Sequence, residues 1–189
     1  NLSASGVLPG LSPTCIIPDP PGAFWLVYKF GIFRVNYPSP SYAMDFREEE
    51  YGTILTSHMA DSVIYVGTEK GLFRVTFPST ERWMVHPVSL EKDEYIHLFA
   101  ACGDALFAAG NRHLYEIKAG EKIRLGPGDY HDLAAADDQT LVAASDEGLA
   151  IYKFSGEEWI KTPIETTATY AHDLTPFHHQ VWFIDNENQ

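Results

Sequence analysis

The fold is decided by the stretch Tyr65-Val66-Gly67-Thr68-Glu69-Lys70-Gly71-Leu72-Phe73-Arg74-Val75. In it, two short apolar runs flank a polar turn that ends in a glycine, which is typical of two antiparallel strands joined as a β-hairpin. Glycine in such a turn allows a positive φ angle at little steric cost. We therefore expect a β-hairpin here.

The same layout recurs along the chain. Its copies begin at Phe24, Ile64, Leu106, Leu141 and Val181, at intervals of 40, 42, 35 and 40 residues. In the first four copies the second apolar run begins eight residues after the first, and the copy at Val181 stops after its first run. A period of this length is typical of the blades of a β-propeller.

Two further strands are predicted around each hairpin. Upstream, Tyr95, Tyr130 and Tyr170 each stand 11 residues before a copy and open short runs that we expect to be the innermost strands. Downstream, runs that include Trp83 and Trp159 are expected to be the outer strands. Four antiparallel strands per unit make a propeller blade. The sequence therefore predicts an all-β fold, a β-propeller of about four or more four-stranded blades.

A helical repeat and a β-sandwich or barrel are the alternatives to this fold. Gly, Pro and β-branched residues interrupt every window that could carry a helical stripe of period 3.6, which argues against a helical solenoid. A sandwich or barrel of many short strands would fit the number of strands, but it would leave the matched spacings unexplained.

The predicted blades occupy residues 23–189, and we expect the first and the last blade to be incomplete. Residues 1–22 contain five prolines and are predicted to be an extended lead-in or linker. Residues 185–189 stand where the next hairpin strand should begin. We therefore favour a fragment of a longer propeller over a small closed ring of four or five blades.

The charge, the length of the apolar runs and the number of cysteines exclude several classes of partner and of structure. The chain has 26 acidic and 13 basic residues and a formal charge of −13, and its basic residues are scattered, which argues against nucleic acid and anionic membranes as partners. No apolar run approaches the roughly 18 to 20 residues of a membrane helix, so we expect no membrane insertion. Cys15 and Cys102 are too few for a disulfide framework. We expect Cys102 to be a buried thiol, and a bridge between the two stays open.

Candidate site residues lie where the predicted innermost strands begin. They are Tyr95, His97, Tyr130, His131, Asp132, Tyr170, His172 and Asp173. If the blades are equivalent, these side chains meet at the mouth of a central channel, where His97, Asp132 and His172 could coordinate a divalent metal. The alternative is that they pack and hydrogen-bond to the neighbouring blade. No cofactor is predicted beyond this metal hypothesis.

The hairpins at 65–75 and 144–152 resemble the regulator-propeller repeats of sensor ectodomains in hybrid two-component systems. The layout is also similar to that of sialidase-type and Kelch-type propellers, although His113 replaces the turn glycine and the aspartate box is not matched. The resemblance implies a recognition module that binds a protein, peptide or carbohydrate ligand, as the sensor part of a larger receptor. It also favours an extracellular or periplasmic location.

Three functional hypotheses follow. The leading one is a non-catalytic recognition module, an inference that rests on the fold class. The Gly-x-Ser-x-Gly nucleophile motif and the Gly-rich phosphate-binding patterns are missing from the sequence, but propeller enzymes can use isolated carboxylates from different blades. The second is a propeller hydrolase or metal-dependent enzyme that uses His97, His131, Asp132 and His172. The third is a structural segment of a larger assembly, with the remaining blades of a longer chain as its partner.

Overall fold

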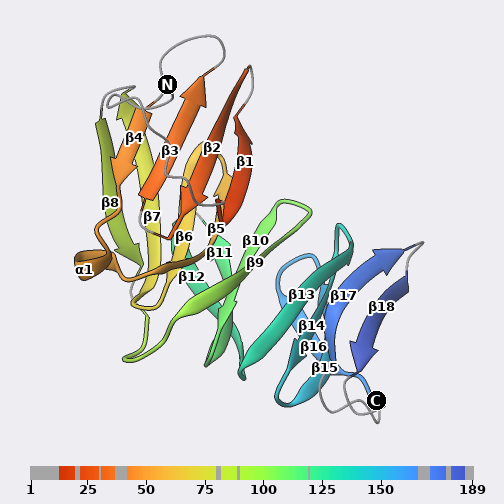
Figure 1. The fold of residues 1–189 in the computed structure, drawn as a ribbon. Coiled ribbons are helices and arrows are strands. Elements are labelled where there is room, and N and C mark those ends of the chain that lie inside the picture. Colours follow the sequence, from red (N-terminus) through yellow and green to blue (C-terminus); the bar gives the residue numbers. More distant parts are fainter. Residues whose placement is uncertain are drawn as a thin grey trace. The chain divides into compact units, whose positions relative to one another are not determined.

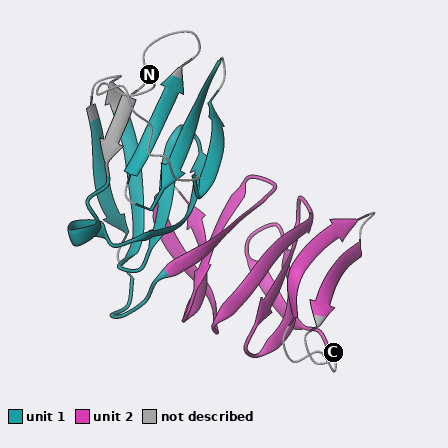
Figure 2. Cartoon of the chain, viewed as in Figure 1, with its two compact units in different colours: residues 1–95 teal, residues 96–189 magenta. Residues whose placement is uncertain are grey.

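The computed structural model describes residues 13–19, 22–29, 31–36, 42–79, 82–88, 90–118, 120–165, 171–177 and 180–185. Its described part consists of β-strands and one helical turn, α1 (Glu48–Tyr51) (Figure 1). The chain divides into two compact units, residues 1–95 (unit 1) and residues 96–189 (unit 2) (Figure 2). No helix in the described part is long and apolar enough to span a membrane.

Unit 1 contains two four-stranded antiparallel sheets, and in each the strands follow chain order. The first sheet consists of β1 (Cys15–Asp19), β2 (Ala23–Tyr28), β3 (Gly31–Asn36) and β4 (Tyr42–Asp45). The second consists of β5 (Ile54–Ala60), β6 (Val63–Thr68), β7 (Gly71–Ser79) and β8 (Arg82–Val88). The turn α1 lies in the connection between them and has Glu48, Glu49 and Glu50 in its first turn.

Unit 2 repeats the same pattern. One sheet consists of β9 (Ile96–Cys102), β10 (Ala105–Gly110), β11 (His113–Lys118) and β12 (Glu121–Pro127). The next consists of β13 (Tyr130–Asp137), β14 (Thr140–Ser145), β15 (Gly148–Phe154) and β16 (Trp159–Pro163). A two-stranded sheet follows, with β17 (Ala171–Phe177) and β18 (Gln180–Asp185). Each four-stranded sheet is a blade of the predicted kind, so the predicted repeat of four antiparallel strands is confirmed.

The predicted start of the blades is wrong. Strand β1 lies inside residues 1–22, which we predicted to be a linker, and it pairs with β2 from Cys15 opposite Val27 to Asp19 opposite Ala23. The first sheet therefore has four strands and is not incomplete. We did not predict this strand because the many prolines of residues 1–22 are typical of a linker. Pro18 lacks an N–H donor, which an edge strand such as β1 tolerates because it pairs on one side only.

The middle strands of the blades are buried on both faces. Leu141 and Ala143 of β14 belong to an apolar cluster with Phe107 of β10. The alternate residues Val142 and Ala144 belong to a second cluster, which includes residues of β17. Successive side chains of a strand point to opposite faces, so a strand covered on both sides has a continuous apolar sequence. Each sheet therefore depends on a neighbouring sheet for burial.

The hairpin turns of different blades are held by the same hydrogen bonds. Thr68 Oγ1 and Ser145 Oγ each accept the amide of the residue two positions later, at 3.0 and 3.2 Å. Thr68 Oγ1 also donates to the carbonyl of Tyr51, at 2.6 Å. Gly71 and Gly148 have φ angles of 130° and 98°, which confirms the predicted role of the turn glycine.

A buried pair of tyrosines, Tyr130 and Tyr152, leaves no room for a side chain at Gly126 of β12. The Oη atoms of Tyr130 and Tyr152 lie 3.0 Å apart, and Tyr130 Oη donates to the carbonyl of Pro127 at 3.1 Å. Burial and the hydrogen bond to Tyr152 raise the pKa of Tyr130, so its hydroxyl stays neutral. A Cβ atom at Gly126 would lie 2.8 Å from Tyr152 Oη and 3.2 Å from Tyr130 Oη. The two rings thus fit against glycine alone.

We expect Gly126→Ala to lower the free energy of unfolding by about 1–3 kcal/mol, because the added methyl group overpacks the tyrosine pair. Urea denaturation followed by circular dichroism measures this change. The double variant Gly126→Ala/Tyr152→Phe lacks the closest atom, so its loss should be smaller than the sum of the two single losses. An unchanged unfolding midpoint in Gly126→Ala would refute this packing.

Candidate functional site

The innermost strands of unit 2, β9, β13 and β17, lie next to one another in the order β9, β13, β17. Ser145 at the β14–β15 turn lies opposite Tyr130, so the start of β13 lies beside that hairpin turn. We use the name strand-start surface for the side chains at the beginning of these three strands. They are His97, His131, Asp132, His172 and Asp173.

Each innermost strand of unit 2 carries an irregularity near its start. In β9 and β13 one extra residue stands between two paired residues, and this residue is His97 in β9 and His131 in β13. In β17 the register shifts between His172 and Thr175, and in β5 of unit 1 the extra residue is Leu55. A β-bulge turns the side chain of its extra residue away from the regular alternation of the strand. His97 and His131 therefore stand at matching positions, whereas His172 is paired with Ile184 and the irregularity of β17 follows it.

The sequence spacing aligned Tyr130 of β13 with Tyr95, and this alignment of the two innermost strands is wrong. Tyr130 lies opposite Ser145 as Ile96 lies opposite Gly110, so Tyr130 matches Ile96 and not Tyr95. A second register shift, between Ala135 and Asp137, lengthens β13 by one residue and hides this from residue counting. Tyr130 is 1% exposed and therefore belongs to the core, not to a channel mouth.

Hydrogen bonds between a side chain of one innermost strand and the backbone of the next join these strands. His97 Nε2 on β9 donates to the carbonyl of Tyr130 on β13, at 2.9 Å. Asp132 Oδ2 on β13 accepts the amide of Leu174 on β17 at 2.6 Å, while its Oδ1 accepts the amide of Leu133 at 2.8 Å. These contacts support the alternative that the sequence left open, in which the strand-start residues hydrogen-bond to the neighbouring blade.

Among the described candidates Asp173 is exposed, whereas His172 is half-buried like His97, His131 and Asp132. His172 Nδ1 lies 3.0 Å from Asp173 Oδ2, and the Asp173 side chain is 71% exposed. Asp173 has a φ of 52°, in the left-handed region that aspartate tolerates better than most residues. This conformation holds the carboxylate at the surface of unit 2.

Further acidic groups come from the β14–β15 turn. Asp146 Oδ1 accepts the amide of Asp129 at 2.9 Å, just before β13 begins. Glu147 is paired with Lys161 Nζ at 2.9 Å. Partial burial lowers the pKa of Lys161, but the hydrogen bond to Glu147 and nearby negative charge outweigh this and raise it. Lys161 therefore stays charged at neutral pH and compensates the charge of Glu147.

The described residues do not form the hypothetical metal centre. Among them, no three His, Cys, Asp or Glu side chains lie close enough together to hold an ion. His97, Asp132 and His172 are instead engaged in the hydrogen bonds given above. His131 is half-buried, Tyr95 is half-buried just before β9, and Tyr170 lies outside the described residues.

The cysteines are both free. Cys102 is 2% exposed, as the sequence predicts, and its Sγ donates to the carbonyl of Asp137 at 3.0 Å. Burial raises the pKa of its thiol, so it is an unreactive group in the core.

No protein-family model matches this chain, and no curated protein matches it. Solved structures do. The chain is similar to the extracellular domain of a predicted one-component system from B. thetaiotaomicron, with a TM-score of 0.64 and 17% identity over 95% of this chain and 27% of that one. A second extracellular domain from the same organism, of a predicted hybrid two-component system, gives a TM-score of 0.64 and 13% identity over 90% of this chain and 25% of that one.

A third similar structure is YCF48 bound to D1 peptide, with a TM-score of 0.56 and 18% identity over 82% of this chain and 55% of that one. At these identities the likeness defines the fold alone, and the fold is that of a β-propeller. The chain spans about a quarter of the length of the two sensor domains.

The hydrogen bond from Leu174 to Asp132 is tested by a matched pair of variants. Asp132→Asn replaces one accepting oxygen by a donor that faces a backbone N–H, and we expect a loss of about 1–3 kcal/mol in the free energy of unfolding. Asp173→Asn makes the same change on an exposed side chain, and we expect a change within about 0.5 kcal/mol. Hydrogen exchange should also become faster at the Leu174 amide in Asp132→Asn. Equal effects of the two variants would contradict the assigned contact.

Proposed function

We propose that this chain is a non-catalytic recognition module that binds a protein or peptide ligand through the strand-start surface. It would act as the sensor part of a larger receptor outside the cell or in the periplasm. The carrying observation is that Asp132 and Asp173, on adjacent innermost strands, lie at the same end of unit 2, where the Asp132 contact to Leu174 holds the two strands together. A rigid frame with exposed polar groups suits binding because little is lost in ordering it.

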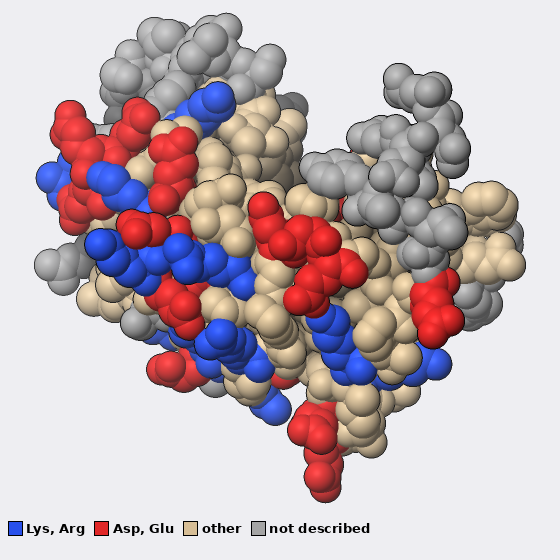
Figure 3. Space-filling view, turned by 90° about the horizontal axis from the view of Figure 1, so that it is seen from below, with Lys and Arg blue, Asp and Glu red and all other residues tan. Residues whose placement is uncertain are grey.

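Charge indicates which ligands this surface favours. The chain has a formal charge of −13, and basic and acidic side chains are interspersed on the face shown in Figure 3. Asp132, Asp146 and Asp173 concentrate negative charge near the strand starts. A ligand with Lys or Arg side chains is therefore favoured over an anionic one. The similar structures include extracellular sensor domains and a propeller protein bound to a peptide, which supports this class of ligand.

A random-sequence peptide array and a glycan array, both probed with the 189-residue chain, test the proposal. We expect retained peptides to be enriched in Lys and Arg. We also expect Asp173→Lys to weaken their binding on the order of tenfold, because it reverses a charge in the site. The control Glu157→Lys makes the same change at an exposed residue between β15 and β16 and should have less than about a threefold effect. Retention of glycans alone, or equal loss in both variants, would overturn the proposal.

A further inference from the structure

The connection between β12 and β13 is bound to a hairpin turn by two reciprocal hydrogen bonds. The amide of Asp129 donates to Asp146 Oδ1 at 2.9 Å, and the amide of Asp146 donates to the carbonyl of Asp129 at 2.9 Å. Asp146 lies in the β14–β15 turn, and Asp129 is the last residue before β13. We call these two hydrogen bonds the Asp129–Asp146 pair.

The Asp129–Asp146 pair extends the pairing of β13 with β14 beyond the bulge of β13. Tyr130 lies opposite Ser145, and His131 is the extra residue that follows. A single pair of the ladder therefore precedes the bulge, and the Asp129–Asp146 pair stands directly before it. If the bulge shifted by one residue, the side chains near it would change faces of the sheet. The two hydrogen bonds thus hold the bulge at His131.

The corresponding turn in unit 1 makes only the backbone bond. Glu69, in the β6–β7 turn, donates its amide to the carbonyl of Thr53, just before β5, at 3.2 Å. The carboxylate of Asp146 adds a second bond, which has no counterpart at Glu69 in the described part of the chain. The added bond belongs to the blade whose innermost strand begins with two of the strand-start residues.

The connection itself is shaped for this close contact. Gly128 has a φ of 136°, and a Cβ atom at this position would lie 3.3 Å from Asp146 Oδ1. The amide of Gly128 donates to the carbonyl of Arg112, in the β10–β11 turn, at 2.8 Å. Hairpin turns of two successive blades therefore hold the connection from both sides.

We propose that Asp146 is a positioning residue of the strand-start surface. It acts through the backbone of Asp129, which determines where β13 begins and therefore where His131 and Asp132 point. The inference rests on the function proposed above, because it gives Asp146 a second role in the same site besides its charge. The two roles are separable, since the positioning role requires an accepting oxygen and not a negative one.

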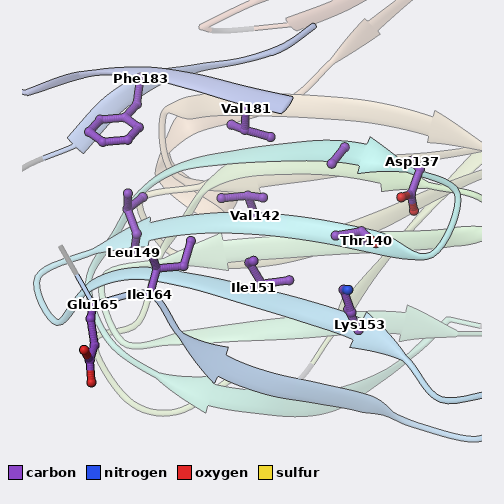
Figure 4. Close-up of a pocket in the computed structure, with 11 residues that line it drawn as sticks. Asp137, Thr140, Val142, Leu149, Ile151, Lys153, Ile164, Glu165, Val181 and Phe183 are labelled. Atoms are coloured by element: carbon purple, nitrogen blue, oxygen red, sulfur yellow. The ribbon is translucent and has the colours of Figure 1, made fainter. Parts of the chain in front are cut away.

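A cavity on the same hairpin takes no part in this arrangement. It has a volume of about 530 Å³, and Leu149 of β15 lines it together with Val181 and Phe183 of β18 (Figure 4). Neither residue of the Asp129–Asp146 pair lines this cavity. The proposed role of Asp146 therefore does not depend on what fills it.

Two variants of Asp146 separate position from charge. Asp146→Ala removes both the accepting oxygen and the charge, and we expect the affinity for the peptide that the array retains most strongly to fall on the order of tenfold. Asp146→Asn removes the charge but keeps an oxygen that accepts the Asp129 amide, so the loss should be no more than about threefold. Both affinities are measured by fluorescence anisotropy, at a temperature at which circular dichroism shows each variant to be folded. Equal losses in the two variants would overturn the inference.

Nuclear magnetic resonance of the isotope-labelled 189-residue chain tests the positioning role without any peptide. The amide signals of His131 and Asp132 should move further in Asp146→Ala than in Asp146→Asn, and the Asp129 amide should exchange on the order of tenfold faster in Asp146→Ala. Unmoved signals in Asp146→Ala would overturn the inference even if Asp173→Lys weakens peptide binding as proposed above. If the array retains no peptide, the proposed function fails, and the amide signals alone then support or overturn the positioning role.

Discussion

The structure depends on the burial of each middle strand between two neighbouring sheets. In β14, alternate side chains enter two different apolar clusters, so one sheet taken alone would expose half of this surface to water. Hydrogen bonds from the side chains of His97 and Asp132 to the backbone of the neighbouring strand then fix the innermost strands to one another. Burial supplies most of the stabilisation, while these polar contacts set the register between blades.

This constraint explains which polar residues are available for recognition. His97 and Asp132 face a neighbouring backbone and hold the strands together, whereas Asp173 reaches solvent from a left-handed turn of the backbone. The same constraint explains the surface of β18. Its sequence is apolar on both faces because middle strands are buried in this fold, and Trp182 and Ile184 are exposed among the described residues.

The hairpins and their period could be predicted from sequence because glycine turns and apolar runs are local signals. Strand β1 could not, since prolines are compatible with both a linker and an edge strand. The site was predicted only in part. Counting residues along the sequence identified the three histidines as candidates. It misaligned Tyr130, which lies in the core, because β13 contains an extra residue. Whether a carboxylate such as Asp132 meets a metal or a backbone amide depends on the neighbouring strand, which the local sequence does not encode.

The most direct test of the central claim is amide hydrogen exchange in Leu141→Ala at low denaturant. Leu141 lies on β14 but packs in the cluster shared with β10, and removing it should cost about 2–5 kcal/mol. If neighbouring sheets depend on one another for burial, exchange should become faster in β9–β12 as well as in β13–β16. Faster exchange confined to β13–β16 would show that each sheet is stable by itself and would contradict the account.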